Sequence, residues 1–254
     1  MDIENKIKTI WSDKNTKNDL TDTIFERGWC YCNDVLEGEK KILLIGFNPS
    51  FREDDDQKSN SYSFKDIMNN TRNKSVNTKG CWDPYWNSIS NMLCDANVDL
   101  RGITSYWDIF SFREKNQSEF KKQIIKENPS SFVIKHIQLA QEIIEEIKPK
   151  LIIVKNKEAW AYFGYFFGRD DSNLKKVRWM NYKYEDIGDI PCGETRYELK
   201  RIIGIHDGYD LNAIQGGQTS ISGAKVLFMP HINQYMKKEN RPSAQWLKDI
   251  IEKY

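Results

Sequence analysis

The sequence lacks the features that would assign it at once to several large classes of protein. No apolar run approaches the roughly 20 residues that a membrane span needs, and the polar start MDIENKIKTIW has no apolar signal region. It has no Walker phosphate loop, no Gly-x-Gly-x-x-Gly run and no Gly-x-Ser-x-Gly nucleophile elbow. We therefore expect a cytoplasmic protein. The missing motifs argue against a nucleotide-binding domain and against a hydrolase with a nucleophile elbow.

An excess of one charge and a cysteine framework are also missing. The 38 Lys and Arg residues nearly balance the 37 Asp and Glu residues, which neither requires nor excludes nucleic acid, because a DNA enzyme needs only a local basic groove. The five cysteines are odd in number, and Cys30 and Cys32 are separated by one residue rather than the zinc spacing of two to four. We expect reduced thiols, no metal and no cofactor.

Enough apolar residues are present for a sizeable core, and short apolar runs alternate with helical patterns. Hydrophobic residues make up 39% of the chain and aromatic residues 13%. Buried strands are predicted at Lys41–Phe47, 102–112, 150–155 and 224–230. Helices are predicted at Asp19–Arg27, 84–97, 130–150, 157–167 and 242–254.

Three segments have weaker patterns. Residues 1–40 read as a polar, irregular extension packed on the domain, apart from the helix named above, and 51–82 as a long functional loop with a short helix near Phe64–Met68. Residues 168–223 read as an insertion in which 194–206 forms an antiparallel pair or an edge strand.

The alternation predicts one α/β domain spanning residues 1–254, because strand–helix repeats favour a parallel sheet covered by helices. We expect three layers, α/β/α, around a mainly parallel sheet of four strands. Ligands of such sheets bind at the carboxyl ends of the strands.

A short motif follows the first predicted strand. The run 45–50, Ile-Gly-Phe-Asn-Pro-Ser, resembles the first motif of the uracil-DNA glycosylase superfamily, and most closely its mismatch-specific and single-strand-selective branches. The resemblance implies that Asn48 positions the attacking water and that Gly46 and Phe47 contribute to base recognition. An amide suits this role because it orients water without ionising. The alternative is that Asn-Pro-Ser only makes the turn after the strand.

The second motif is the strand end Tyr106–Phe110. In the superfamily an asparagine near this place reads the edge of uracil, and the matching residue here is Asp108. Because carboxylate oxygens only accept hydrogen bonds, Asp108 favours a base with an exocyclic amine, such as a cytosine derivative. Asp108 capping a turn is the alternative.

The third motif follows the last predicted strand. It resembles the family's His-Pro-Ser loop in a degenerate form, with His231 in the place of the histidine that stabilises the departing base. Asn233, Gln234 and Tyr235 follow as DNA-binding candidates, and the last two, with Met236, as candidates for a wedge into the duplex. The alternative for His231 is an ordinary surface histidine.

A flipped base also needs an aromatic platform and cations for its phosphates. Phe51 is the stacking candidate, and the alternatives are Tyr62, Phe64 and Trp82. The phosphate-binding candidates are Arg52, Lys237, Lys238 and Arg241. Solvent-exposed residues are the alternative for these cations.

Some superfamily members hold an iron–sulfur cluster on four cysteines, but Cys81, Cys94 and Cys192 are scattered here, so none is expected.

The resemblance implies a monomeric DNA glycosylase of base-excision repair that binds DNA and no membrane, and leaves an abasic site. Its base is uracil or a modified cytosine, and defence against phage with modified DNA is one setting. No lysine is placed for Schiff-base chemistry, so strand cleavage is not expected. The alternative is a catalytically silent protein that binds nucleic acid or a protein partner.

Overall fold

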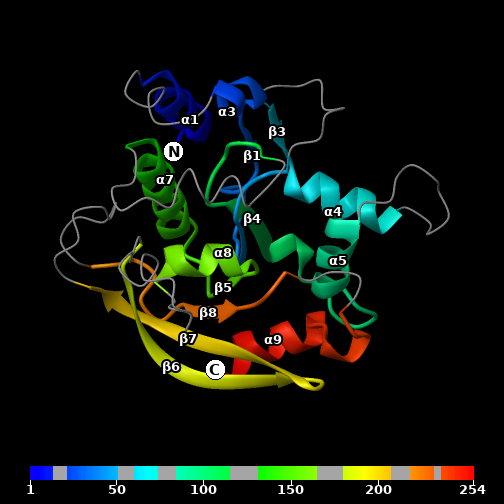
Figure 1. The fold of residues 1–254 in the computed structure, drawn as a ribbon. Coiled ribbons are helices and arrows are strands. Elements are labelled where there is room, and N and C mark those ends of the chain that lie inside the picture. Colours follow the sequence, from blue (N-terminus) through cyan, green and yellow to red (C-terminus); the bar gives the residue numbers. More distant parts are fainter. Residues whose placement is uncertain are drawn as a thin grey trace.

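A central sheet of six strands organises the computed structural model of the chain (Figure 1). The structure describes residues 1–13, 22–50, 60–73, 84–114, 131–164, 180–206, 218–231 and 236–254. In their order across the sheet, the strands are β4 (Thr104–Asp108), β2 (Ile42–Gly46), β5 (Leu151–Val154), β8 (Lys225–Phe228), β7 (Thr195–Ile205) and β6 (Tyr182–Cys192).

The strands β4, β2, β5 and β8 are parallel and are the four that the apolar runs predict. Every residue of β2, β4 and β5 is buried, as expected of strands covered on both faces. The prediction of a mixed α/β fold with a mainly parallel sheet is thus confirmed. The predicted count of four strands is wrong, because the antiparallel pair of β6 and β7 extends the sheet at β8.

Helices lie on both sides of the parallel strands. They are α1 (Ile3–Ser12), α3 (Asp22–Arg27), α4 (Phe64–Asn73), α5 (Pro84–Leu93), α7 (Ser131–Ile147), α8 (Lys157–Trp160) and α9 (Ala244–Lys253), with short 3-10 helices η1 (Arg101–Ile103), η2 (Ala161–Phe163) and η4 (Lys238–Asn240). In the described part of the chain, no helix is long and apolar enough to cross a membrane.

The two helical groups follow from the direction of the crossovers. The chain runs from β2 to β4 through α4 and α5, and from β4 back past β2 to β5 through α7. Crossovers between parallel strands are almost always right-handed, so crossovers in opposite directions lie on opposite faces. Figure 1 shows α4 and α5 on one side of β2 and β4, and α1 with α7 on the other.

The N-terminal segment is less irregular than predicted. Asp2 caps α1, whose buried residues Ile3, Ile7 and Ile10 recur at helical spacing, and the helix packs against α7. The same segment contains β1 (Cys30–Cys32), which pairs in parallel with β3 (Asn60–Tyr62). The expectation of a polar, irregular start is therefore wrong for these residues.

A buried carboxylate fixes the start of α4. Asp34 accepts hydrogen bonds from the backbone nitrogens of Phe64 and Lys65, both at 2.9 Å, and from the Ser63 hydroxyl at 2.7 Å. These bonds satisfy amides that the first turn of a helix leaves unpaired. They also fix the segment that carries Tyr62, which lines the pocket described below.

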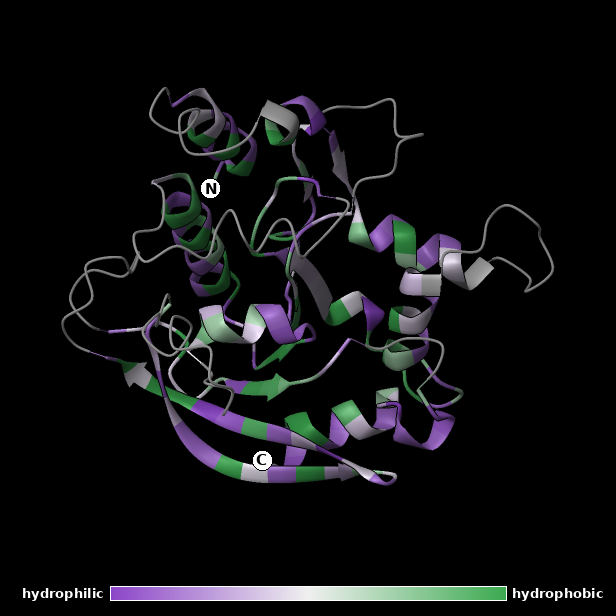
Figure 2. Ribbon diagram, viewed as in Figure 1, coloured by the Kyte–Doolittle hydropathy of each residue, from purple (hydrophilic) through white to green (hydrophobic). Residues whose placement is uncertain are grey.

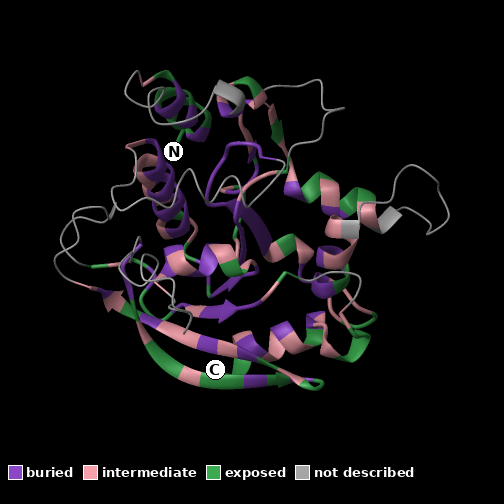
Figure 3. Cartoon of the chain, in the orientation of Figure 1, coloured by how far each residue is buried: buried purple, intermediate pink, exposed green. Residues whose placement is uncertain are grey.

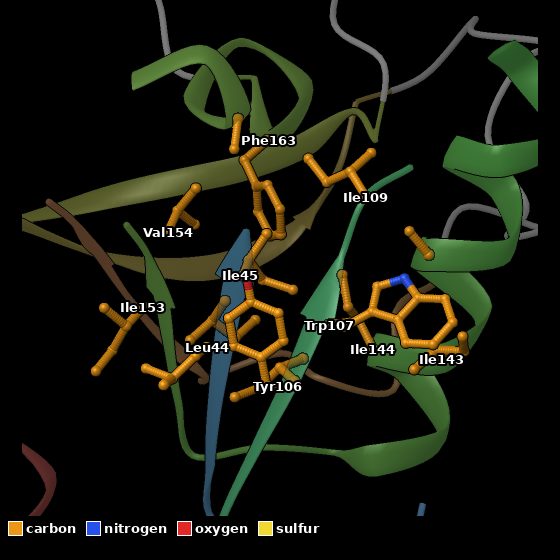
Figure 4. Packing of buried hydrophobic residues seen from close by; sticks show 14 of the residues in the cluster. Leu44, Ile45, Tyr106, Trp107, Ile109, Ile143, Ile144, Ile153, Val154 and Phe163 are labelled. Atoms are coloured by element: carbon orange, nitrogen blue, oxygen red, sulfur yellow. The ribbon is translucent and has the colours of Figure 1, made fainter. Parts of the chain in front are cut away.

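Neighbouring residues of β4 point to opposite faces of the sheet. Figure 4 shows the Trp107 ring against Ile143 and Ile144 of α7, with Tyr106 on the other side of the strand. Because strand side chains alternate, Asp108 shares the face of Tyr106, towards α4 and α5. The hydropathy colours of Figure 2 show a second contrast: β2, β5 and β8 are mostly apolar, whereas β6 and β7 are mixed.

The helix predicted at 157–167 is shorter in the structure, where its α-helical part ends at Trp160. The α-helical turn α8 passes into η2, and Gly164 follows with a φ of 78°. This left-handed conformation favours glycine and ends helices.

Candidate functional site

One pocket lies at the carboxyl ends of the parallel strands. Its volume is about 450 Å³, within the range of small-ligand sites. The chain continues from β2 to β4 on one side of the sheet, and from the adjacent β5 to the strands on the other side. The pocket lies at this reversal of the strand order, which is the usual binding position in such sheets. Its lining residues are Cys30, Gly46, Phe47, Asn48, Pro49, Ser50, Tyr62, Ile67, Tyr85, Trp86, Tyr106, Asp108, Lys155, Asn156 and His231.

The amide of Asn48 has one engaged end and one open end. Its Nδ2 donates a hydrogen bond to the carbonyl of Pro49 at 3.0 Å. Its Oδ1 is buried and has no hydrogen-bond partner in the described part of the chain. A buried acceptor without a partner costs free energy, so this oxygen is ready to accept a hydrogen bond from water or a ligand.

Gly46 allows two polar side chains to come close to the backbone of β2. Gly46 is the register partner of Asp108, and a Cβ on it would lie 1.9 Å from Asp108 Oδ1 and 2.2 Å from the Tyr106 hydroxyl. No side chain fits this space. The role that the structure supports for Gly46 is steric, whereas Phe47 lines the pocket and packs its ring against Phe110 and Tyr162.

Asp108 is a buried carboxyl group on the β4 side of the pocket. The Tyr106 hydroxyl donates to its Oδ1 at 2.8 Å. Burial raises the pKa of Asp108 to about 6, against the opposing effects of this hydrogen bond and of the charge of Lys155. The group therefore titrates near neutral pH, as functional carboxylates often do.

Lys155 lies on the opposite side, directly after β5. Its side chain is buried, its Nζ donates to the Tyr85 hydroxyl, and it lies 3.9 Å from the centre of the Tyr85 ring. Burial lowers the pKa of Lys155 to about 7, and the negative charge of Asp108 opposes this shift.

The backbone around Lys155 is fixed on both sides. Its nitrogen donates to the Ile45 carbonyl at 3.2 Å, and Asn156 caps α8. The indole of Trp160 donates to the carbonyls of Val154 and Met229, which links α8 to the ends of β5 and β8. The lysine thus stands on a rigid strand end rather than on a loose loop.

A continuous chain of hydrogen bonds joins Lys155 to Asp108. Lys155 donates to Tyr85, the Tyr85 and Tyr106 hydroxyls lie 2.5 Å apart, and Tyr106 donates to Asp108. Because Tyr106 uses its hydrogen on Asp108, Tyr85 must be the donor in the middle bond. All three bonds therefore point from the amine to the carboxylate.

His231 lies at the mouth of the pocket after β8. Its ring stacks on Tyr85 with centroids 5.6 Å apart and planes at 19°. Burial and the nearby charge of Lys155 lower the pKa of His231, so its imidazole is neutral at pH 7. A neutral imidazole can donate one hydrogen bond and accept another.

Aromatic rings form most of the remaining wall. Tyr62 lies 5.8 Å from Trp86, and Trp86 lies 5.2 Å from Tyr106, between ring centroids. Both Tyr62 and Trp86 line the pocket, whereas Phe64 is buried below it and stacks on Tyr106. The rings of Tyr62, Trp86 and Tyr85 suit the face of a planar ligand.

The structure brings together Gly46, Phe47, Asn48, Asp108 and His231 from the predicted site. The other predicted residues divide into two groups. Those that lie outside the described residues are Phe51, Arg52, Asn233, Gln234 and Tyr235, together with the alternative Trp82.

The remaining predicted DNA-binding residues do not line the pocket. Lys237 pairs with Glu194 in the β6–β7 turn at 2.7 Å, and Arg241 donates to the carbonyl of Met236 at 2.8 Å. Lys238 is exposed in η4. Phosphate binding by these three residues stays a prediction.

Among the pocket residues that were not predicted from the sequence are Lys155, Tyr85 and Trp86. Lys155 ends an apolar strand, where a lysine usually reaches solvent. One signal was available, since Lys155 stands at the carboxyl end of a predicted parallel strand, as Asn48 and Asp108 do. Tyr85 has no such signal, because its contact with Lys155 joins residues that are 70 positions apart in the sequence.

The described cysteines and carboxylates suggest no metal site. Cys30, Cys32, Cys94 and Cys192 form no disulfide, and no cluster of three His, Cys, Asp or Glu residues suitable for a metal occurs within the described ranges. Comparison with models of known protein families and with curated proteins finds no match for this chain.

Proposed function

We propose that this protein is a DNA glycosylase that hydrolyses the N-glycosidic bond of a flipped pyrimidine-type base, on a fold of the uracil-DNA glycosylase type. One observation carries the proposal: a single aromatic pocket contains Asn48, Asp108 and His231. Each follows or ends a different parallel strand, and each matches one of the three motifs that the resemblance rests on.

Asn48 is the residue that orients the water. Its open Oδ1 accepts a hydrogen bond from the water, which adds to the anomeric carbon while the bond from that carbon to the base nitrogen breaks. The electron pair leaves with the base, and the proton of the water neutralises it. The neutral imidazole of His231 donates to the base oxygen on which negative charge grows.

Asp108 selects the base. As a carboxylate it accepts from an exocyclic amine, which a cytosine derivative has and uracil lacks. The tyrosine and tryptophan rings of the pocket hold the base by its faces once it has left the stack. A modified cytosine is therefore the substrate that this pocket fits best.

The test is base release from labelled oligonucleotides, single- and double-stranded, that carry uracil, mismatched thymine, cytosine, hydroxymethylcytosine or glucosylated hydroxymethylcytosine. Release of the free base is measured by mass spectrometry. Release of any of these bases, with preference for an amine-bearing one, supports the proposal. No release from the whole panel, with DNA binding intact, contradicts it and favours a silent binding protein.

A further inference from the structure

Lys155 lies in an environment that is unfavourable for an ammonium group. The side chain is 4% exposed, and its Nζ donates to a phenol rather than to a carboxylate of the described residues. An ammonium group taken out of water without a close counter-ion is unfavourable, so burial favours the neutral amine. A neutral lysine amine is a nucleophile.

The hydrogen-bond chain supplies a route for the proton that the amine must lose. Lys155 donates to Tyr85, Tyr85 to Tyr106, and Tyr106 to Asp108, so one shift along the three bonds moves a proton from Nζ to the carboxylate. The product is a neutral amine and a neutral carboxyl group. Because Lys155 and Asp108 are both buried, the neutral pair avoids the cost of keeping two charges out of water.

Lys155 also lies on the same cavity as Asn48, where the sugar of a flipped nucleotide is expected. We infer that Lys155 is a nucleophile that forms an imine with the deoxyribose of an abasic site and thereby cleaves the DNA strand. This inference goes beyond hydrolysis and rests on the proposed function only for the origin of the abasic site. It reverses the expectation that no lysine is placed for Schiff-base chemistry.

The chemistry needs no oxidant, reductant or cofactor. The Nζ of Lys155 adds to the aldehyde carbon of the ring-opened sugar. The carbonyl oxygen takes one proton from Nζ and one from the neutral carboxyl group of Asp108, and it leaves as water. The iminium ion makes the hydrogen on the neighbouring carbon acidic, and the neutral imidazole of His231 takes it as a proton. The bond to the 3′ oxygen breaks, its electron pair leaves with the phosphate, and water then hydrolyses the imine to restore the amine.

The test uses the full chain and an oligonucleotide that already carries an abasic site, with sodium cyanoborohydride present to reduce any imine to a stable bond. We expect the wild type to form a covalent protein–DNA product on a denaturing gel and, without reductant, to cleave the strand 3′ of the site. Lys155→Gln loses both. Lys157→Gln, which removes an exposed lysine two residues away, retains both.

Mass spectrometry of the digested wild-type product locates the modified residue, so the test does not depend on the folding of a variant. Modification at Lys155 supports the inference. No covalent product, or a product at another residue, overturns it. Because this substrate has no base to release, a negative result here leaves the base-release test of the proposed function unaffected.

Discussion

The four parallel strands and the hairpin of β6 and β7 belong to one sheet, yet their side chains are buried to very different degrees (Figure 3). Every residue of β2 and β5 is buried, whereas most of β6 is exposed or half-buried. The carboxyl ends of the parallel strands all reach one edge of the sheet, and the pocket with its polar groups lies there. Of the two hairpin strands only β6 runs in the direction of the parallel strands, and neither β6 nor β7 contributes a residue to the lining of the pocket.

The polar residues of the hairpin also make a different kind of contact. Lys200 pairs with Asp186 at 2.5 Å and with Glu198 at 2.7 Å, near the solvent. In the pocket, by contrast, Asp108 and Lys155 are buried, and burial shifts the pKa of each towards neutrality. The comparison shows that the parallel strands form the pocket with the buried polar groups and that the hairpin extends the sheet.

The largest expected effect follows from filling the space beside Gly46. In Gly46→Ala the new methyl group would meet Asp108 Oδ1 at 1.9 Å, so the carboxylate and Tyr106 must move. We expect base release to fall about a hundredfold and the free energy of unfolding to fall by about 1–3 kcal/mol. Single-turnover kinetics and denaturant unfolding measure the two effects.

Gly102→Ala is the matched control, because nothing lies within 4 Å of the Cβ that it adds. It should leave base release unchanged. Full activity of Gly46→Ala would show that the positions of Asp108 and Tyr106 do not matter for the reaction.

The next effect concerns which base is released. In Asp108→Asn the side chain gains a donor, so we expect the preference between amine-bearing bases and uracil to shift towards uracil by about 1–3 kcal/mol. Competition between the two oligonucleotides measures the ratio. Asp189→Asn, an exposed carboxylate of the hairpin, is the control and should change nothing. An unchanged ratio in Asp108→Asn removes the reason to favour a modified cytosine.

The pH dependence gives an independent view of Asp108. Because its pKa is raised to about 6, the carboxylate that accepts from the amine is present above this pH and lost below it. Release of an amine-bearing base should therefore fall about tenfold per pH unit below pH 6. Lys155 and His231 face the same pocket and also gain protons on acidification, so Asp108→Asn separates the contributions. A pH profile that is identical in this variant contradicts the assignment.

The smallest effect is expected in the hairpin. Lys200→Gln removes both ion pairs of Lys200, and pairs near the surface are worth little. We expect the free energy of unfolding to fall by less than about 1 kcal/mol, with no change in base release. A large loss of activity would mean that the hairpin takes part in the function, which contradicts the contrast between the hairpin and the parallel strands.

The fold was predictable where the apolar residues of the sequence pattern are also the residues that the structure buries. The apolar runs of β2, β5 and β8 and the spacing of Phe132, Ile137 and Ile144 in α7 are visible in the sequence and match the structure. In α1, Glu4, Lys6 and Lys8 lie between the buried isoleucines, so the segment reads as polar in the sequence. In β6 only Tyr182, Ile190 and Cys192 are buried, and the exposed residues between them interrupt the apolar alternation that predicts a strand.

The site was predictable only where one residue carries its own local signal. Asn48, Asp108 and His231 follow or end apolar runs, and the structure places all three on the pocket. The role of Lys155 depends on burial by Tyr85, a contact between residues 70 apart in the chain. Such burial follows from tertiary packing, and no local pattern shows it.

The most direct test of the central claim is the single-turnover rate of base release by Asn48→Ala beside the wild type, on the oligonucleotide that the wild type cleaves best. We predict a rate at least about a hundredfold lower, because the water loses the acceptor that orients it. Loss of the hydrogen bond to Pro49 should cost no more than about 1 kcal/mol of stability. An equal rate in the folded variant would contradict the claim that this pocket performs the hydrolysis.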